Sequence, residues 1–242
     1  MSSLFLTSYQ DAVRDAAARQ LKFTEYTQEQ RISWDSLNGV IARVDRMELW
    51  GPAADEHSGV CAALGGRVAF DRYLWEEAER LPYSGSLSCR LIIRKWLQDP
   101  DNLATWLNGA FCVAIYDRHA GELHVFTDRM GIFPIYVAEH PGILLCSHPD
   151  VLADTLDLAG LRNEPDLTTM AEFLATGTGT HPYTYYASVR QLDPASHYIW
   201  RINEELSRFS GKTYWRPAFL SAPAEGLDER RAQPLAEAFT SA

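Results

Sequence analysis

The sequence predicts an α+β fold, in which helices and strands are grouped rather than alternated. Apolar residues recur three and four apart in residues 72–81 and again in 88–97, with Pro82 and Gly85 between the two segments. This pattern indicates two consecutive helices. From residue 110 onward, short segments with strand-like alternation follow one another. Paired helices and runs of strands are typical of α+β layering and argue against a parallel βαβ sheet.

The N-terminal elements follow from apolar patterning and turn residues. Residues 3–7 are a short apolar segment that predicts a buried strand, and the Ala- and Arg-rich residues 11–21 have the spacing of a helix. Asn38 and Gly39 stand between two apolar runs within residues 32–44. An Asn-Gly dipeptide in that setting predicts a hairpin that turns there.

The rest of the chain continues the pattern. Two strand-like segments lead to Gly65 and Gly66, where we expect tight backbone geometry. Beyond the helix pair the alternation and the intervening glycines predict strands at 111–117, 123–127, 134–137 and 143–147. Helices are expected at 150–156 and 167–176, followed by strand-like stretches at 183–191 and 197–202.

The last residues predict a linker and then the start of a helix. Residues 221–229 are rich in Ala, Pro and charge, and residues 230–242 look helical without a C-cap. We therefore expect one domain at 1–220 and, at 221–242, a linker with the beginning of a second domain. A frayed terminus is the alternative.

Composition narrows the classes of partner. The chain has 22 Lys+Arg against 32 Asp+Glu, and its basic residues are scattered, so nucleic-acid binding is not expected. The start lacks the features of a signal peptide and no apolar run is long enough for a membrane span. We expect a cytoplasmic protein with no membrane partner, and the sequence leaves a homo-oligomer open.

The cysteines and histidines predict no metal site. The four cysteines stand singly in apolar stretches without metal-ligand spacing, and we expect buried reduced thiols: Cys61, Cys89, Cys112 and Cys146. His119, His124 and His140 lie in or near expected turns and are expected to be solvated. Ser147, His148 and Asp150 cannot form a catalytic triad if adjacent strand residues point to opposite faces.

Short motifs between residues 106 and 217 carry a family resemblance. They read Trp-Leu-Asn-Gly-Ala-Phe-Cys-Val-Ala-Ile-Tyr-Asp at 106–117, Asp-Arg-Met-Gly-Ile-Phe-Pro-Ile-Tyr at 128–136 and Leu-Leu-Cys-Ser-His at 144–148. In this order they resemble the core of class II glutamine amidotransferases. The stretches at 173–177, 189–198 and 213–217 resemble the asparagine-synthetase form of that family.

The resemblance covers residues 106–217 well and residues 1–105 loosely. It implies an N-terminal-nucleophile fold, a four-layer αββα sandwich of two antiparallel sheets between helices. It also implies that the partner is a C-terminal synthetase domain of ATP-pyrophosphatase type in the same chain, begun at 221–242. ATP and Mg²⁺ would be cofactors of that domain, and none is expected for residues 1–220.

The same resemblance places Ser2 where the family has its N-terminal cysteine nucleophile, whose own amino group is the base. Gly65, Gly66 and Arg67 match the family's Asn-Gly-Glu, so the backbone donor to the oxyanion is kept and the side-chain donor is lost. Losing one such donor typically costs about 3 kcal/mol of transition-state stabilisation. Arg67 also reverses charge in a pocket that must hold an ammonium group, unless a nearby carboxylate compensates.

Two further parts of the glutamine pocket are changed. Ser88 and Arg90 fall in the stretch that matches the family's Ser-Asp-Thr-Glu, so the Asp that grips the substrate ammonium is absent. The family's Arg-His-Arg-Gly-Pro-Asp segment, which holds the substrate carboxylate, has no counterpart between Lys22 and Asp45.

The changed pocket predicts a degenerate, non-catalytic domain of an asparagine-synthetase-like amide ligase. Ligases that resemble β-lactam synthetases or lasso-peptide cyclases need no ammonia, and they fit best. Two alternatives stay open. The domain could be a working glutamine-hydrolysing part of an asparagine synthetase, or Ser2 could be the nucleophile of another amidohydrolase.

The aromatic residues near the end of the chain are interpreted as half-buried strand residues, with a surface for the following domain as the alternative. They are Tyr183, Tyr185, Tyr186, Tyr198, Trp200, Tyr214 and Trp215.

Overall fold

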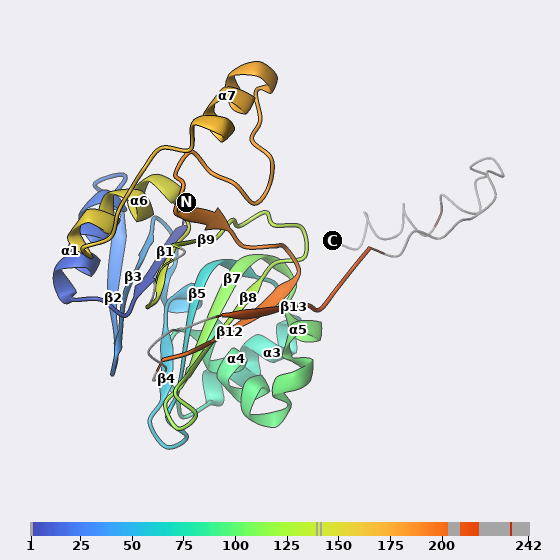
Figure 1. Cartoon of the computed structure of the whole chain (residues 1–242). Coiled ribbons are helices and arrows are strands. Elements are labelled where there is room, and N and C mark those ends of the chain that lie inside the picture. Colours follow the sequence, from blue (N-terminus) through green and yellow to red (C-terminus); the bar gives the residue numbers. More distant parts are fainter. Residues whose placement is uncertain (1, 139, 141, 203–208, 218–232, 234–242) are drawn as a thin grey trace.

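The computed structural model describes residues 2–138, 140, 142–202, 209–217 and 233. Within these residues two antiparallel sheets lie face to face and helices cover the outer face of each (Figure 1). The predicted α+β fold of four layers is confirmed. In the described part of the chain, no helix is long and apolar enough to cross a membrane.

The first sheet has the N-terminal strand at its centre. Strand β1 (Ser2–Thr7) pairs with β3 (Leu37–Arg43) on one side and β10 (Leu144–Cys146) on the other. The described strand order is β11-β9-β10-β1-β3-β2, where β2 is Gln28–Trp34, β9 is Tyr136–Ala138 and β11 is Val189–Gln191. Helices α1 (Asp11–Gln20) and α6 (Pro149–Leu158) cover its outer face through one apolar cluster.

The second sheet is built on the long strands β5 (Val60–Val68) and β7 (Gly109–Asp117). Its described order is β13-β12-β8-β7-β5-β4-β6, where β4 is Ala53–Asp55, β6 is Ser84–Gly85, β8 is Glu122–Thr127, β12 is Ser196–Arg201 and β13 is Ser210–Thr213. The predicted helix pair, α3 (Arg72–Arg80) and α4 (Leu87–Gln98), lies on its outer side. The short helices α2 (Met47–Trp50), η1 (Pro100–Asn102) and α5 (Leu103–Trp106) were not predicted.

Alternation along β1 determines which residues face the second sheet. Leu4 and Leu6 belong to the apolar core between the two sheets, whereas Phe5 belongs to the cluster under α1 and α6. Because side chains alternate along a strand, Ser2 lies on the same side as Leu4 and faces the second sheet. This orientation makes a contact between Ser2 and strand β5 possible.

The first hairpin forms as predicted, but the predicted turn is wrong. Strands β2 and β3 are joined at Asp35, which has φ of 49°, and Asn38 and Gly39 lie inside β3. A Cβ on Gly39 would lie 2.5 Å from the carbonyl oxygen of Phe5 and 2.6 Å from Leu6 Cδ2. Glycine is therefore required at position 39 by close strand packing rather than by a turn.

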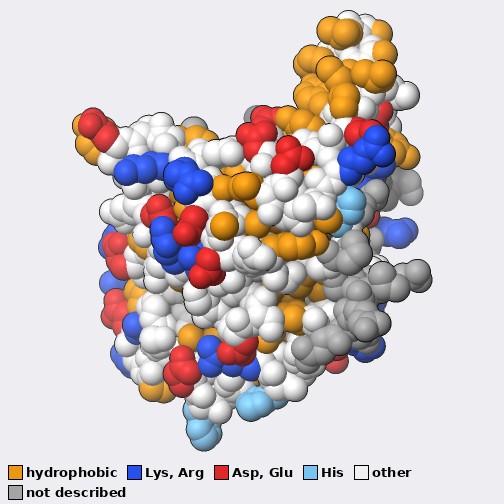
Figure 2. Space-filling model, turned by 60° about the vertical axis from the view of Figure 1, so that its left-hand side comes forward, with side chains coloured by type: hydrophobic (Ala, Val, Ile, Leu, Met, Phe, Trp, Pro, Cys, Tyr) orange, Lys and Arg blue, Asp and Glu red, His pale blue; other side chains and the backbone are white. Residues whose placement is uncertain are grey.

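In the C-terminal part a helix and a strand form at predicted places, and this strand is shorter than predicted. Helix α7 (Leu167–Thr176) forms as predicted and stands away from the sheets (Figure 1). Figure 2 shows hydrophobic side chains gathered on this projection, where Leu167 and Leu174 are exposed. The strand-like stretch 183–191 forms a strand only at Val189–Gln191. The expected linker at 221–229 lies outside the described residues, as does the expected helix at 230–242 apart from Gln233.

The aromatic residues near the end of the chain divide into three groups, of which Tyr186, Tyr214 and Trp215 are half-buried as expected. Tyr198 and Trp200 are buried in the core between the sheets, whereas Tyr183 and Tyr185 are exposed. Burial of the four cysteines without disulfides is confirmed.

Candidate active site at the start of the first strand

Ser2 and Gly66 meet across the two sheets. The Ser2 hydroxyl oxygen accepts a hydrogen bond of 3.1 Å from the backbone N–H of Gly66. Gly66 lies inside β5 rather than in a turn, and it has φ of 79°. A Cβ at this position would lie 2.1 Å from the carbonyl oxygen of Ala110, so only glycine fits. The structure thus brings together the residue at the nucleophile position and the expected backbone donor.

Phe133 occupies the space beside Gly65. Its ring atoms Cε1 and Cζ would lie 2.6 Å and 2.7 Å from a Cβ on Gly65, and the Cβ of Leu4 would lie at 3.0 Å. Real side chains do not approach so closely, so any residue larger than glycine would collide with the ring. The position aligned with the family's side-chain donor is therefore filled by an apolar ring.

Asp128 holds Phe133 in place. This fully buried carboxylate accepts hydrogen bonds from the backbone N–H groups of Phe133 at 2.8 Å, of Met130 and Ile132 at 3.0 Å each, and of Phe111 at 3.3 Å. A carboxylate that satisfies several backbone donors fixes the path of a turn. The Asp-Arg-Met-Gly turn recognised in the sequence thereby positions the ring over Gly65.

Arg67 is not an unpaired charge in the pocket. Its Nε and Nη2 lie 2.9 Å and 2.7 Å from Asp45 Oδ2, and the buried Arg43 contacts Asp45 Oδ1 through Nε at 2.7 Å. Burial alone would raise the pKa of Asp45, but the hydrogen bonds from Arg43 and Arg67 outweigh it and the pKa is lowered. Asp45 is the compensating carboxylate that the sequence analysis left open. Two guanidinium groups share this one acid, and both lie over the Trp50 ring, at 5.4 Å and 5.1 Å.

Ser88 and Arg90 bind backbone carbonyl groups of α2 and β6, respectively, and not Ser2. The Ser88 hydroxyl donates to the carbonyl oxygen of Leu49, and Arg90 Nε donates to that of Gly85 at 2.9 Å. In the described part of the chain, neither side chain has a hydrogen bond to Ser2. The sequence placed five residues in one pocket with Ser2, and among them the structure gives a hydrogen bond to Ser2 for Gly66.

A sequence profile described as a glutamine amidotransferase domain matches residues 75–215. The chain belongs to this family. The curated protein Amidase chry2 of Gibberella zeae (strain ATCC MYA-4620 / CBS 123657 / FGSC 9075 / NRRL 31084 / PH-1) is 23% identical over 165 residues, which are 68% of this chain and 23% of that protein.

Two solved structures share the fold of this amidotransferase domain. One is described as the allosteric regulatory enzyme of purine biosynthesis, with 12% identity and a TM-score of 0.52. The other is glutamine phosphoribosylpyrophosphate amidotransferase from B. subtilis complexed with ADP and GMP, with 13% identity and the same TM-score of 0.52. Each match covers 90% of this chain and 50% of the other. At these identities the likeness concerns the fold alone.

Two histidines of the amidotransferase domain, His148 and His124, have partners that the sequence did not reveal. His148 Nε2 lies 2.9 Å from the hydroxyl of Ser3, which is fully buried on the face of β1 opposite to Ser2. His124 is not solvated as expected: it is buried in β8, with Nδ1 3.0 Å from Nε2 of His197. These pairs join segments far apart in sequence, so local patterning contains no signal for them.

The described residues contain no group of three or more His, Cys, Asp or Glu side chains that could hold a metal ion. Around Ser2 the structure places a hydroxyl, the backbone donor of Gly66 and the paired charges of Arg43, Asp45 and Arg67.

Proposed function

We propose that this amidotransferase-type domain lacks glutaminase activity and forms the amino-terminal part of an ATP-dependent amide ligase of the asparagine-synthetase type. The observation that carries the proposal is the ring of Phe133 beside Gly65. Without a side-chain donor at position 65, a developing oxyanion would receive a hydrogen bond from the Gly66 N–H alone. This N–H already donates to the Ser2 hydroxyl. One missing donor corresponds to a loss of about a hundredfold or more in rate.

The nucleophile and the charges support the same conclusion. A serine hydroxyl ionises far less readily than a cysteine thiol, so it depends more on the oxyanion donors. Arg43 and Arg67 together carry one positive charge more than Asp45 neutralises. A pocket with that balance disfavours the ammonium group of glutamine.

The rest of the proposal rests on the resemblance at 173–177, 189–198 and 213–217. Residues 1–220 would be the amidotransferase-like domain, and 221–242 a linker with the start of an ATP-pyrophosphatase-type domain that uses ATP and Mg²⁺. A ligase of the β-lactam synthetase or lasso-peptide cyclase type takes its amine from its own substrate and requires no ammonia. The chain spans 23% of the curated relative and 50% of each solved structure, so the parent's substrate is part of the proposal.

The test is ammonia release from glutamine by the purified chain, measured beside Ser2→Ala. We expect both proteins to release ammonia at the rate of buffer alone. Release by the wild-type chain that Ser2→Ala abolishes would overturn the proposal and favour a working glutaminase domain.

A second candidate function is an amidohydrolase that uses Ser2 on another amide. Two findings favour it: the Gly66 N–H lies within hydrogen-bond distance of the Ser2 hydroxyl, and the curated relative is named an amidase. This mechanism needs the free amino group of Ser2 as base, and therefore removal of Met1. Intact-mass measurement decides the point, since a chain that retains Met1 excludes this function.

A further inference from the structure

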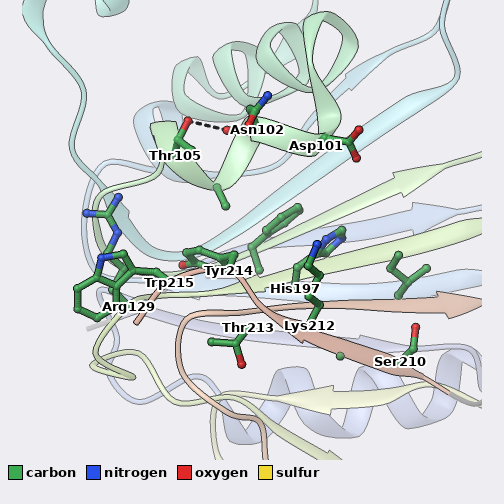
Figure 3. A pocket seen from close by; sticks show the side chains of 14 residues that line it. Asp101, Asn102, Thr105, Arg129, His197, Ser210, Lys212, Thr213, Tyr214 and Trp215 are labelled. Carbon is green, nitrogen blue, oxygen red and sulfur yellow. Dashed lines mark hydrogen bonds between the residues drawn. The ribbon is translucent and has the colours of Figure 1, made fainter. Parts of the chain in front are cut away.

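A second cavity lies on the outer face of the seven-stranded sheet, away from Ser2. It has a volume of about 860 Å³ and is bounded by β8, β12 and β13 on one side and by η1 and α5 on the other (Figure 3). Ser2 faces the space between the sheets, whereas Phe126 in this cavity belongs to the apolar cluster outside them. The cavity is large enough for a small organic molecule.

Among the described residues, four aromatic side chains line the cavity: Phe126, His197, Tyr214 and Trp215. The rings of Phe126 and His197 stack with centroids 4.1 Å apart at 10°. The hydroxyl of Tyr214 donates to the backbone carbonyl of Thr127, which anchors that ring. Figure 3 shows Tyr214 between Trp215 at one end of the cavity and His197 toward the other. These flat surfaces suit contact with a planar ligand.

Within the described residues, neither Arg129 nor Lys212 of the cavity forms an ion pair with an acid. The Arg129 guanidinium lies 5.9 Å from the centroid of the Trp215 ring, and its Nε is buried without a hydrogen-bond partner among the described residues. A stacked guanidinium keeps its N–H donors available in the plane of the group. Lys212 on β13 has no ion pair within the described ranges, and Asp101 is the acid that lines the cavity.

We propose that this cavity binds a small organic anion that carries a flat ring. The anionic group would pair with the guanidinium of Arg129, which lines the cavity. The ring would lie over Tyr214 toward His197, with Lys212 adding positive potential from the other end. A phosphate ester and a carboxylate share this chemistry. The inference is independent of the state of the Ser2 site.

The test is isothermal titration of the purified chain with AMP, benzoate, adenosine and inorganic phosphate. We expect AMP or benzoate to bind saturably at one site, and adenosine and inorganic phosphate to bind at least about tenfold more weakly, since each lacks one of the two recognised features. Tighter binding of AMP would identify phosphate as the anion, and tighter binding of benzoate would identify carboxylate.

Variants locate the site. Arg129→Gln should weaken binding of the preferred anion about tenfold or more. Lys212→Gln, at an exposed position, should weaken it by about threefold and reduce its salt dependence. Arg72→Gln removes a cation that is 95% exposed on α3 and should have no effect.

Three results would overturn the proposal. In the first, neither AMP nor benzoate binds. In the second, inorganic phosphate binds as tightly as the preferred ligand, and in the third, binding is unchanged in both Arg129→Gln and Lys212→Gln. Circular dichroism of each variant confirms that it is folded. If Arg129→Gln does not fold, Lys212→Gln decides by itself, because its side chain is exposed.

Discussion

The ring of Phe133 lies 2.6 Å from the position that a Cβ on Gly65 would take. Gly65 lies in β5 and Phe133 in the loop before β9, yet each explains the other: glycine leaves a space and the ring fills it. Replacing Gly65 alone with a larger residue would therefore create a collision, and replacing Phe133 alone with a smaller residue would leave a cavity. The absence of a side-chain donor at position 65 is a property of the packing as well as of the sequence.

Gly65→Asn is expected to destabilise the fold by about 1–3 kcal/mol without creating glutaminase activity, because the new side chain collides with Phe133. Urea unfolding and ammonia release measure the two effects. Gly160→Asn makes the same chemical change at a position with nothing within 4 Å of the new Cβ. Its φ of 73° is one that Asn tolerates. Equal stability of the two variants would contradict the proposed collision.

Asp45→Asn and Arg67→Gln should differ in cost although both break the same ion pair. Asp45→Asn leaves the guanidinium of Arg43 buried without its counter-charge and should cost about 3 kcal/mol. The Arg67 side chain is 61% exposed, so Arg67→Gln should cost less than about 1 kcal/mol. Urea unfolding at pH 7 measures the loss of unfolding free energy in both variants. Similar losses would show that the burial of Arg43 does not make its ion pair with Asp45 more important for stability.

Acidification should remove the contribution of the Asp45 carboxylate to the free energy of unfolding. Because its pKa is lowered in the folded protein, its contribution is fully present above the unfolded pKa and is lost as the pH falls through the lower, folded pKa. The stability difference between wild type and Asp45→Asn should therefore shrink on acidification below about pH 4. A constant difference over that range would contradict the assignment.

His197 should contribute to acid sensitivity at a higher pH. Burial, followed by the charges of His124 and Lys212, lowers its pKa from 6.5 to about 4. Protons then bind more readily to the unfolded chain, so this group lowers stability as the pH falls from about 6.5 to about 4 and adds no further slope below that. His197→Gln should flatten the plot of unfolding free energy against pH in this window. His57→Gln, at an exposed position, controls for the loss of a histidine.

The four native thiols should resist alkylation. Burial raises the pKa of Cys61 to about 11 and those of Cys89 and Cys146 to about 12, and it also raises that of Cys112. Since the thiolate is the reactive form, iodoacetamide at pH 8 should modify the folded chain far more slowly than the unfolded one. Mass spectrometry counts the modified cysteines.

Ser2→Cys extends this labelling experiment to the candidate site. Its thiol would stand at a half-buried position, so it should be the first to react in the folded protein. Labelling of Ser2→Cys no faster than that of wild type would mean that reagents do not reach the start of β1.

Local sequence patterns predicted most of the fold because they depend on near neighbours. Helical spacing predicted α3 and α4, alternation predicted β7 and β8, and the family motifs predicted the stacking of two sheets. Strand β13 was not predicted, since Ser210–Thr213 has neither an apolar side nor a marked turn. The Asn-Gly dipeptide predicted a turn where the glycine instead accommodates a neighbouring strand.

The sequence by itself determined the family, the layered α+β fold and the residue at each aligned site position. The resemblance predicts Ser2 at the nucleophile position and Gly66 as the backbone donor, and both predictions follow from the order of residues. Only the tertiary structure decided that Phe133 fills the space beside Gly65, and that Asp45 forms ion pairs with both Arg43 and Arg67. The physical reason is that collision and charge compensation depend on distances between side chains from different elements. Those distances are fixed by the packing of the two sheets and their loops, whereas a periodic pattern reports only which face of an element is apolar.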